Sequence, residues 1–368
     1  MRHQISRKIV VLGALAVIPV AAGCSSGNPS SSVNQGAAAA SQPASSASAG
    51  ASGGGNLYGQ AKAEGHLTFY CAQDPVTCAG LGSAFQKAYP GISVDALQLQ
   101  SATLGTRFTS EKKAHAATAD VVMLSDFSFL STAQSAGFLL PWSKAGISGY
   151  SAIPKQWLDP VTGDPFTYVT WGIAYNTQMV SASQVPKTWS DLLDPQWKGK
   201  LVESACQVSK AAAVGWGTIA SYVPGGGAKF LQALSKQNMS ENTGGEEGAT
   251  AEVAAGEYAL QPVANAGNIT ALKQKGAPIA ITFPSDTTGP PYGVGLDAQP
   301  DHPAAQKLFA QWLISKAGEE ALHAVNPYSV SQYAGPANIK SVTPNLAYFN
   351  NPGYTQTLGP QGLNCLSS

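Results

Sequence analysis

The sequence predicts an α/β fold with two packed lobes, and three observations lead to this expectation. Strand-like and helix-like stretches alternate along much of the chain, as in a mostly parallel sheet with helices on both faces. The chain has 368 residues. Without an export signal and a linker about 310 remain, enough for two domains of roughly 100–200 residues each. Gly (39) and Pro (24) are plentiful, which suits a loop-rich α/β protein better than a helical bundle.

The first part of the folded chain shows the alternation most clearly. Residues 67–71 form a compact apolar strand, and residues 92–97 alternate like a second strand. Pro90-Gly91 ends the helix between them. The other elements expected in this part are helices over 58–65, 79–89, 104–115 and 127–136, and a strand over 120–124.

The second part begins with a β-rich run over residues 166–175. The elements expected after it are a short helix within 186–200, strands at 201–202, 258–260, 279–283 and 293–296, and helices over 210–220, 228–234, 250–256, 302–315 and 316–324. No internal repeat is visible.

The N-terminus predicts export. A basic segment over 1–8 precedes an apolar run over 9–20, and Ala21-Ala22-Gly23 leads to Cys24. The run is shorter than the ~20 residues of a spanning helix. The small residues before Cys24 resemble the lipobox of bacterial lipoproteins, although Ala21 stands where Leu is usual. This resemblance implies that Cys24 is diacylated and becomes the mature N-terminus. An ordinary cleaved signal with a chance cysteine is the alternative.

We therefore expect a lipoprotein signal peptide over 1–23 and a disordered Ser/Ala/Gly tether over 24–56. The protein would lie outside the cytoplasm, anchored to the cell membrane through the lipids on Cys24.

Charge argues against a nucleic-acid partner. Three of the 21 basic residues lie in the signal, which leaves 18 against 21 acidic side chains, and Arg107 is the only arginine beyond it. A nucleic-acid-binding protein needs a basic stripe, and none is visible.

Four cysteines remain after Cys24, namely Cys71, Cys78, Cys206 and Cys365. An even number in an exported protein indicates disulfides, and the sequence leaves all three pairings open. Without a CxxC pair or neighbouring histidines, a zinc site is not expected, and no other metal or cofactor is indicated.

Six stretches, in order, resemble bacterial ABC-transporter substrate-binding proteins of the ferric-iron, thiamine and polyamine type. The clearest is Val185–Lys200, which reads VPKTWSDLLDPQWKGK. The others are FQKAYPGISV at 85–94, LGTRFTSE at 104–111 with ADVV at 119–122, AAGE at 254–257, KGAP at 275–278, and HPAAQKLF at 302–309 with SKAGE at 315–319.

The resemblance implies a periplasmic-binding-protein type 2 fold, with a ligand cleft between two lobes and two crossing strands. The first lobe would comprise 57–168 and 288–368, and the second 169–287. A chain of this kind is expected to be a monomer and not an enzyme, and to carry a small ligand to the permease and ATPase of an ABC importer.

Candidate ligand-binding residues lie in the loops at the carboxyl ends of the strands, where helix N-termini offer free N–H groups. The candidates are Gln73, Asp74, Ser101, Thr103, Ser125, Asp126, Ser204, Ser209, Lys210, Glu246 and Asn265. Trp171 and Tyr292, in the expected crossings, would suit a ring or a cation. Helix capping explains the polar residues equally well, and core packing explains the two aromatic ones.

The sequence leaves the ligand open. Ferric-binding members of the family carry adjacent tyrosines after the Gly-Glu motif, whereas Gly256-Glu257 is followed by Tyr258-Ala-Leu-Gln. The ligand could be an organic cation meeting Asp74, Asp126, Glu246 or Asp286, a small anion at helix N-termini and Lys210, or a polar neutral molecule.

Two other classes of function were weighed. A secreted hydrolase is disfavoured because GxSxG and HExxH are absent, and the SxxK match at 110–113 suits a solvated helix face. A ligand-sensing or scaffold lipoprotein with the same fold and no transporter remains open.

Overall fold

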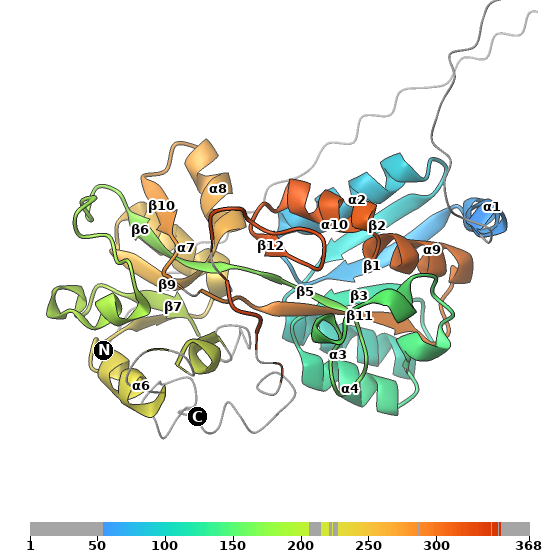
Figure 1. Cartoon of the computed structure of the whole chain (residues 1–368), viewed down its shortest axis with the longest axis horizontal. Helices are drawn as coiled ribbons and strands as arrows, with labels where there is room; N and C mark the ends of the chain where they lie inside the picture. The colour runs from blue at the N-terminus through green and yellow to red at the C-terminus, as the bar shows by residue number, and fades with distance from the viewer. Residues whose placement is uncertain are drawn as a thin grey trace, which may run out of the picture. The chain divides into compact units, whose positions relative to one another are not determined.

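The chain forms one large β-sheet and two small ones (Figure 1). The computed structural model describes residues 54–205, 215–220, 223, 227–285, 287–339, 341–344 and 346. These residues belong to a single compact unit. No helix among them is long and apolar enough to cross a membrane.

The large sheet has the strand order β12-β5-β11-β3-β1-β2, with β4 paired to β11. Its strands are β1 (His66–Cys71), β2 (Ser93–Gln98), β3 (Val121–Leu124), β4 (Leu139–Leu140), β5 (Phe166–Val169), β11 (Pro291–Asp297) and β12 (Ser329–Val330). The helices of this lobe are α1 (Gly54–Glu64), α2 (Pro75–Ala88), α3 (Ser101–Lys113), α4 (Phe127–Ser135), α9 (Pro303–Leu313) and α10 (Lys316–Val325).

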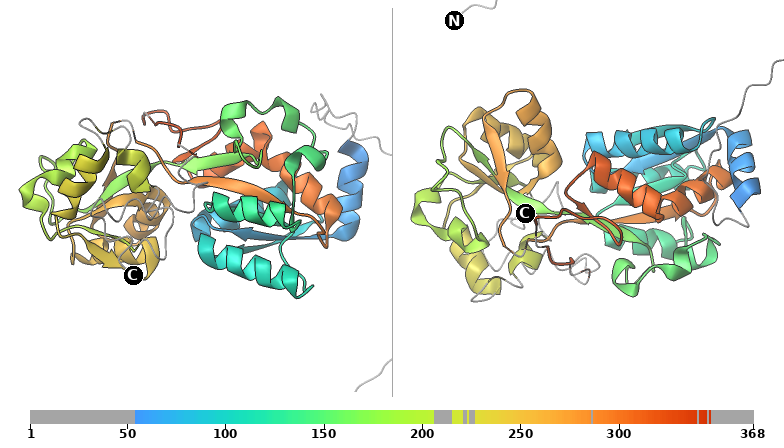
Figure 2. Two further views of the ribbon diagram at one scale, coloured as in Figure 1. Left: turned by 90° about the horizontal axis from the view of Figure 1, so that it is seen from below. Right: turned by 45° about the horizontal axis from the view of Figure 1, so that its top comes forward.

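Helices cover both faces of this sheet, as the sequence predicts. In Figures 1 and 2, α2, α9 and α10 lie on one face and α3 and α4 on the other. Phe85 and Phe309 from the first group and Phe108 from the second are fully buried against strands such as β1. The alternation of strand and helix thus produces a three-layered lobe.

The prediction of a mostly parallel sheet is wrong. β1 pairs in parallel with β2 and β3, but β11 runs antiparallel to β3, β4 and β5, and β12 runs antiparallel to β5. The reason is the path of the chain. β11 returns from the other lobe and enters the sheet in the opposite direction to β3.

Several helices begin earlier than the apolar spacing suggests. α2 starts at Pro75 instead of residue 79, because the Asp74 carboxylate accepts from the Thr77 N–H (3.0 Å) and Pro75 needs no N–H partner at that position. Likewise α7 starts at Gly245 instead of residue 250, and α8 was not predicted. The first turn of α7 reads Gly-Glu-Glu-Gly, so it carries no apolar periodicity to detect.

The second lobe contains the two small sheets. One has the order β10-β6-β9, from β6 (Trp171–Asn176), β9 (Leu260–Asn265) and β10 (Ile279–Thr282), and the other pairs β7 (Val202–Ser204) with β8 (Ser240–Asn242). Its helices are α6 (Gly227–Ser235), α7 (Gly245–Ala255) and α8 (Ala266–Gln274), and residues 215–220 are also helical. Trp171, Trp189, Trp197 and Trp216 pack together with Leu260 in its main core.

Two backbone segments join the lobes. The chain passes from β5 to β6 through Thr170, and it returns through residues 283–290 into β11. The segments bond to each other, since the Trp171 N–H donates to the Thr288 carbonyl (2.8 Å) and the Thr287 hydroxyl donates to the Trp171 carbonyl (2.6 Å). Gly289 makes this approach possible, because a Cβ there would overlap the carbonyl oxygen of Val169.

We predict that Gly289→Ala destabilises the protein by at least about 1–3 kcal/mol, the usual cost of overpacking, because the clash is with backbone that cannot rotate away. Denaturant unfolding followed by circular dichroism measures this. Gly59→Ala is the control. Gly59 lies in α1 with no atom near its missing Cβ, so that change should raise stability by up to about 1 kcal/mol. Equal stability of the two variants would contradict the role of Gly289.

Candidate functional site

The first lobe brings its predicted polar residues to one edge of the sheet. Asp74 and Asp126 cap α2 and α4, accepting from the N–H groups of Thr77 and Phe129. Ser101, in the first turn of α3, lies with its hydroxyl 2.9 Å from that of Ser125, which follows β3. The carboxyl ends of β1, β2 and β3 therefore share one polar rim, as expected for parallel strands.

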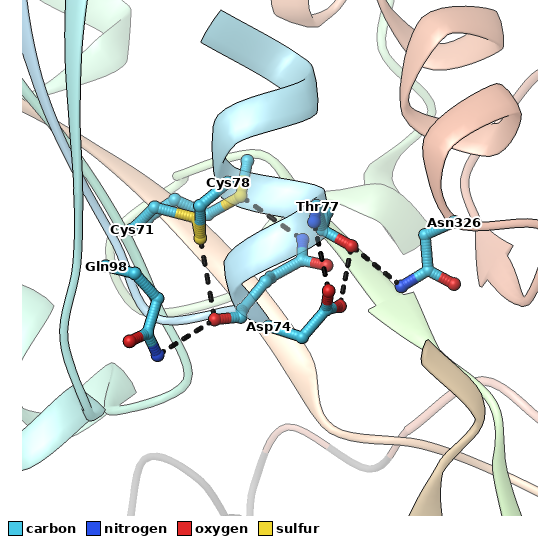
Figure 3. Close-up of a disulfide and its surroundings, with 8 residues drawn as sticks. Cys71, Asp74, Thr77, Cys78, Gln98 and Asn326 are labelled. Carbon is cyan, nitrogen blue, oxygen red and sulfur yellow. Dashed lines mark hydrogen bonds between the residues drawn. A yellow bond between two sulfur atoms is a disulfide. The ribbon is translucent and has the colours of Figure 1, made fainter. Parts of the chain in front are cut away.

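A disulfide constrains the loop that carries Gln73 and Asp74. Cys71 at the end of β1 is bonded to Cys78 in α2, with 5.7 Å between their Cα atoms, and this is one of the three pairings that the sequence leaves open. Figure 3 shows the bridge beside Asp74, Thr77 and Asn326. Gln98 donates to the Gln73 carbonyl (3.2 Å), and Asn326 donates to the Thr77 hydroxyl (3.2 Å).

The rim loop is therefore preorganised. In the chain-entropy model, closing so short a loop contributes roughly 2–3 kcal/mol. The Asp74 carboxylate also accepts from the Thr77 hydroxyl (2.6 Å), so that its direction is set by two donors of one residue.

The second lobe faces this rim with acidic side chains at the start of α7. Asn242 accepts from the Gly244 N–H (2.7 Å), and Gly245 has a φ of 84°, which only a glycine adopts without strain. This turn places Glu246 and Glu247 in the first turn of α7. Carboxylates are favourable there because the helix dipole is positive at that end.

Glu246 and Glu203 are held by backbone donors. Glu246 accepts from the Asn265 N–H (2.5 Å), and Asn265 in turn caps α8 by accepting from the Gly267 N–H (2.8 Å). Glu203, 2% exposed in β7, accepts from the N–H groups of Ser204 (2.8 Å) and Val263 (2.7 Å). The two glutamates thus have fixed positions between β7, β9 and α7.

The two lobes meet at these residues. Gln100, which precedes α3, donates to a Glu247 carboxylate oxygen (3.3 Å). A Cβ on Gly267 in α8 would lie 3.0 Å from the Asp74 carboxylate. Polar groups from both lobes therefore lie in a single cluster, which we call the interlobe cluster and define as Gln73, Asp74, Gln100, Glu203, Ser204, Glu246, Glu247, Asn265 and Tyr292.

The electrostatics of the interlobe cluster are those of unbalanced negative charge. Burial raises the pKa of Glu246 well above its ordinary value, and the charges of Glu247, Glu203 and Asp74 raise it further. Burial raises the pKa of Glu203 to about 8, although backbone donors oppose the shift. Burial raises the pKa of Tyr292 well above its ordinary value, and the charges of Glu246, Asp74 and Glu247 raise it further.

Some predicted residues lie elsewhere. Trp171 is 1% exposed and packs in the core of the second lobe, and Thr103 is exposed on α3. Asp126 lies on the first lobe's rim. Ser209, Lys210, Asp286, Cys24, Cys206 and Cys365 lie outside the described residues.

Sequence reasoning did not single out Gln100, Glu203 and Glu247. A usable signal existed for Glu247, because two glycines followed by two glutamates is typical of a turn opening a helix. Glu203 begins the polar stretch that follows the expected strand at 201–202, but only its burial distinguishes it from the other polar residues there.

No group of three or more His, Cys, Asp or Glu side chains within the described residues is arranged to hold a metal ion.

The comparisons with known proteins agree with this geometry. Residues 116–356 match the sequence profile of a family described as "Bacterial extracellular solute-binding protein". An uncharacterized protein of Haemophilus influenzae is 26% identical over 284 residues, which cover 71% of this chain and 76% of the relative.

Solved structures show the same fold. The periplasmic binding protein AfuA from Actinobacillus pleuropneumoniae, with fructose-6-phosphate bound, has a TM-score of 0.62 at 21% identity, covering 80% of this chain and 96% of AfuA. Iron-bound HitA from Pseudomonas aeruginosa has a TM-score of 0.59 at 21% identity, covering 82% and 99%. A substrate-binding protein of an ABC transporter from Agrobacterium tumefaciens has a TM-score of 0.64 at 14% identity, covering 81% and 94%. These similarities confirm the two-lobed periplasmic-binding-protein fold.

We predict that the ligand-free protein loses stability as pH rises from about 5 to about 8. Glu203 and Asp164 have pKa values raised by burial to about 8, and Glu319 to about 7. Between the unfolded and folded pKa values the folded state holds more protons, so the free energy of unfolding falls by about 1.4 kcal/mol per pH unit for each such proton. Thermal unfolding across this pH range measures the slope.

Glu203→Gln removes one of these titrating groups. Between pH 4.5, the ordinary pKa of glutamate, and about pH 8, the stability of the variant should therefore fall less steeply, by the contribution of about one proton. Below pH 4.5 the two proteins should show the same slope. Glu320→Gln, on the exposed face of α10, is the control and should leave the slope unchanged. Stability that rises between pH 5 and pH 8 would contradict this prediction.

Proposed function

Because this chain belongs to the family of bacterial extracellular solute-binding proteins, we propose that it captures a small solute between its lobes and delivers it to the permease and ATPase of an ABC importer. It performs no chemistry on the solute. It works as a monomer, with the lobes divided near residues 168 and 288, where the backbone crosses from one sheet to the other.

The observation that carries this proposal is the interlobe cluster itself. Polar side chains from α2, α7 and β11 lie together beside the two crossing segments. Buried acids that face one another are unfavourable, so a protein of modest stability keeps them only where a ligand compensates them. A site at a lobe interface opens and closes by bending of the crossing segments, which is a common movement in binding proteins.

Closure gives a direct test. Gly267 and Asp74 approach across the interface, and a Cβ on Gly267 would lie 3.0 Å from an Asp74 oxygen and 3.1 Å from the Asn265 side-chain oxygen. We predict that Gly267→Ala hinders closure and weakens solute binding by roughly tenfold, or about 1.4 kcal/mol. The solute would be the one that most raises the melting temperature in a screen, and calorimetry would give its affinity.

The unfolding temperature without solute should change little in Gly267→Ala, because the open form has room for the methyl group. Gly59→Ala in α1 is the matched control and should bind with wild-type affinity. Equal affinity in all three proteins would contradict closure at this contact. No binding by any solute class would contradict the proposed function.

The membrane anchor is a further part of the proposal. It is supported by the lipobox-like residues before Cys24 and by the Ser/Ala/Gly-rich stretch that follows. Cys24→Ala should move the protein from the membrane fraction to the soluble extracytoplasmic fraction, as immunoblotting of cell fractions would show. Ser25→Ala is the control. A variant that stays with the membrane would argue against lipidation of Cys24.

The alternative of a sensing lipoprotein makes a different prediction in cells. If the protein feeds an importer, deleting its gene abolishes uptake of the bound solute. If it is a sensor, uptake persists and a transcriptional response to the solute is lost.

A further inference from the structure

We propose that the solute is a small organic cation, whose ammonium N–H groups are bound by Asp74, Glu246 and Glu247 and by the hydroxyl of Tyr292. Glu203 is buried beside them in β7. This inference rests on the proposed function, since it names the chemical class of solute for the same interlobe site.

The first argument is the charge imbalance. Within the described residues, no lysine, arginine or histidine forms an ion pair with any of these four acids. The partly buried basic side chains of the first lobe have partners elsewhere, Lys112 with Asp297 (2.6 Å) and His302 with Asp120 (2.9 Å). Carboxyl groups removed from water without a counter-charge hold their protons more tightly, as the raised pKa values of Glu246 and Glu203 show, and a cationic solute would stabilise their ionised form.

The second argument is independent of charge. Tyr292 is 5% exposed, and its hydroxyl makes no hydrogen bond within the described residues, yet it faces Glu246, Asp74 and Glu247. The side-chain oxygens of Gln73 and Ser204, 1% and 2% exposed, also lack partners there. Buried polar atoms are normally bonded. The Gln73 oxygen can only accept, so it favours a solute that donates, and the two hydroxyls can accept from the same solute.

An anionic solute is disfavoured by how the helix N-termini are used. Asp74 takes the Thr77 N–H of α2, Asp126 takes the Phe129 N–H of α4, and Asn265 takes the Gly267 N–H of α8. One donor at each of these three N-termini is thus occupied by the protein's own side chains. The N-termini of α3 and α7 have no side-chain cap, but at α7 the carboxyl groups of Glu246 and Glu247 disfavour an anion. Arg107 is occupied too, because it bonds to Glu111 (2.7 Å) and lies over the Tyr70 ring (5.2 Å).

A neutral solute or a metal ion fits less well. A sugar would donate hydroxyl groups but would leave the carboxylates without a counter-charge. The described acids do not form a metal cage. An ammonium group combines several donors with a positive charge, and an aromatic ring such as that of Tyr292 also favours a cation.

The test uses mature protein and probes matched in shape. 1,4-Diaminobutane carries two ammonium groups, 1,4-butanediol is its neutral counterpart, and inorganic phosphate is the anion. A wider panel adds primary, secondary and quaternary amines, sugars and sugar phosphates at millimolar concentration. At least one ammonium compound should raise the melting temperature and bind in calorimetry, while its neutral counterpart does not.

Variants place the binding within the cluster. Glu246→Gln and Glu247→Gln should each weaken binding of that ammonium compound roughly ten- to hundredfold, the loss expected for one charge-assisted hydrogen bond. Tyr292→Phe should weaken it less. Glu257→Gln is the matched control, because Glu257 is exposed just beyond the other end of α7. It should bind as the wild type does.

Binding should also depend on pH. Asp74 from α2, Glu203 from β7, Glu247 from α7 and Tyr292 from β11 all face Glu246, and Asn265 from α8 donates to it. A cation favours the ionised form of Glu246, so binding should release protons and tighten as pH rises from 6 to 8. Calorimetry in two buffers of different ionisation enthalpy measures the protons released.

Lys210 lies outside the described residues. It is the side chain of this protein that could neutralise the acids in place of a cationic solute. If the wild-type protein binds no ammonium compound and the Lys210→Gln variant does, the inference is overturned, because this lysine then supplies the positive charge. Binding of a sugar or phosphate that Glu246→Gln leaves unchanged would overturn the inference while the proposed function stands. Failure of every class of probe would overturn both.

Discussion

Two stretches of backbone run side by side between the lobes, and their contact at Gly289 constrains the structure on either side. Because Gly289 has no Cβ, residues 287–290 approach Val169 and Trp171 closely enough to bond to them. β11 then enters the large sheet between β3 and β5, antiparallel to both. The same crossing brings Tyr292 to the rim formed by the ends of β1 and β3. The position of the interlobe cluster is thus a consequence of how the chain crosses.

The first lobe presents a rigid surface to this crossing. The Cys71–Cys78 bridge and the Thr77 donors set the position of Asp74, and the hydroxyl pair of Ser101 and Ser125 ties α3 to the end of β3. The second lobe contributes side chains held by backbone N–H groups, as Glu246 is held by Asn265. A site whose groups are fixed before binding loses less conformational entropy when the solute arrives. The polar and acidic groups of the interlobe cluster are therefore positioned before any solute binds.

The family, the fold class and many residues of the interlobe cluster could be predicted from the sequence. The six stretches that resemble substrate-binding proteins lead to the family, and the family profile and the solved structures confirm it. The polar loops at strand ends contain Gln73, Asp74, Ser204, Glu246 and Asn265, which the structure brings into one cluster. The prediction failed where burial or chain direction decides the outcome. Trp171 lies in the core, and the sheet is mixed because a strand returns from the other lobe.

The sequence by itself determined the α/β class, the family and the loops in which polar residues would gather. These features depend on local composition and on the order of elements, which can be read along the chain. Only the tertiary structure decided which acids meet. Asp74 and Glu246 are 172 positions apart and come together across two lobes, and Glu203 and Tyr292 join them from separate sheets. The charge imbalance that defines the site is a sum over neighbours in space, and no stretch of sequence contains that sum.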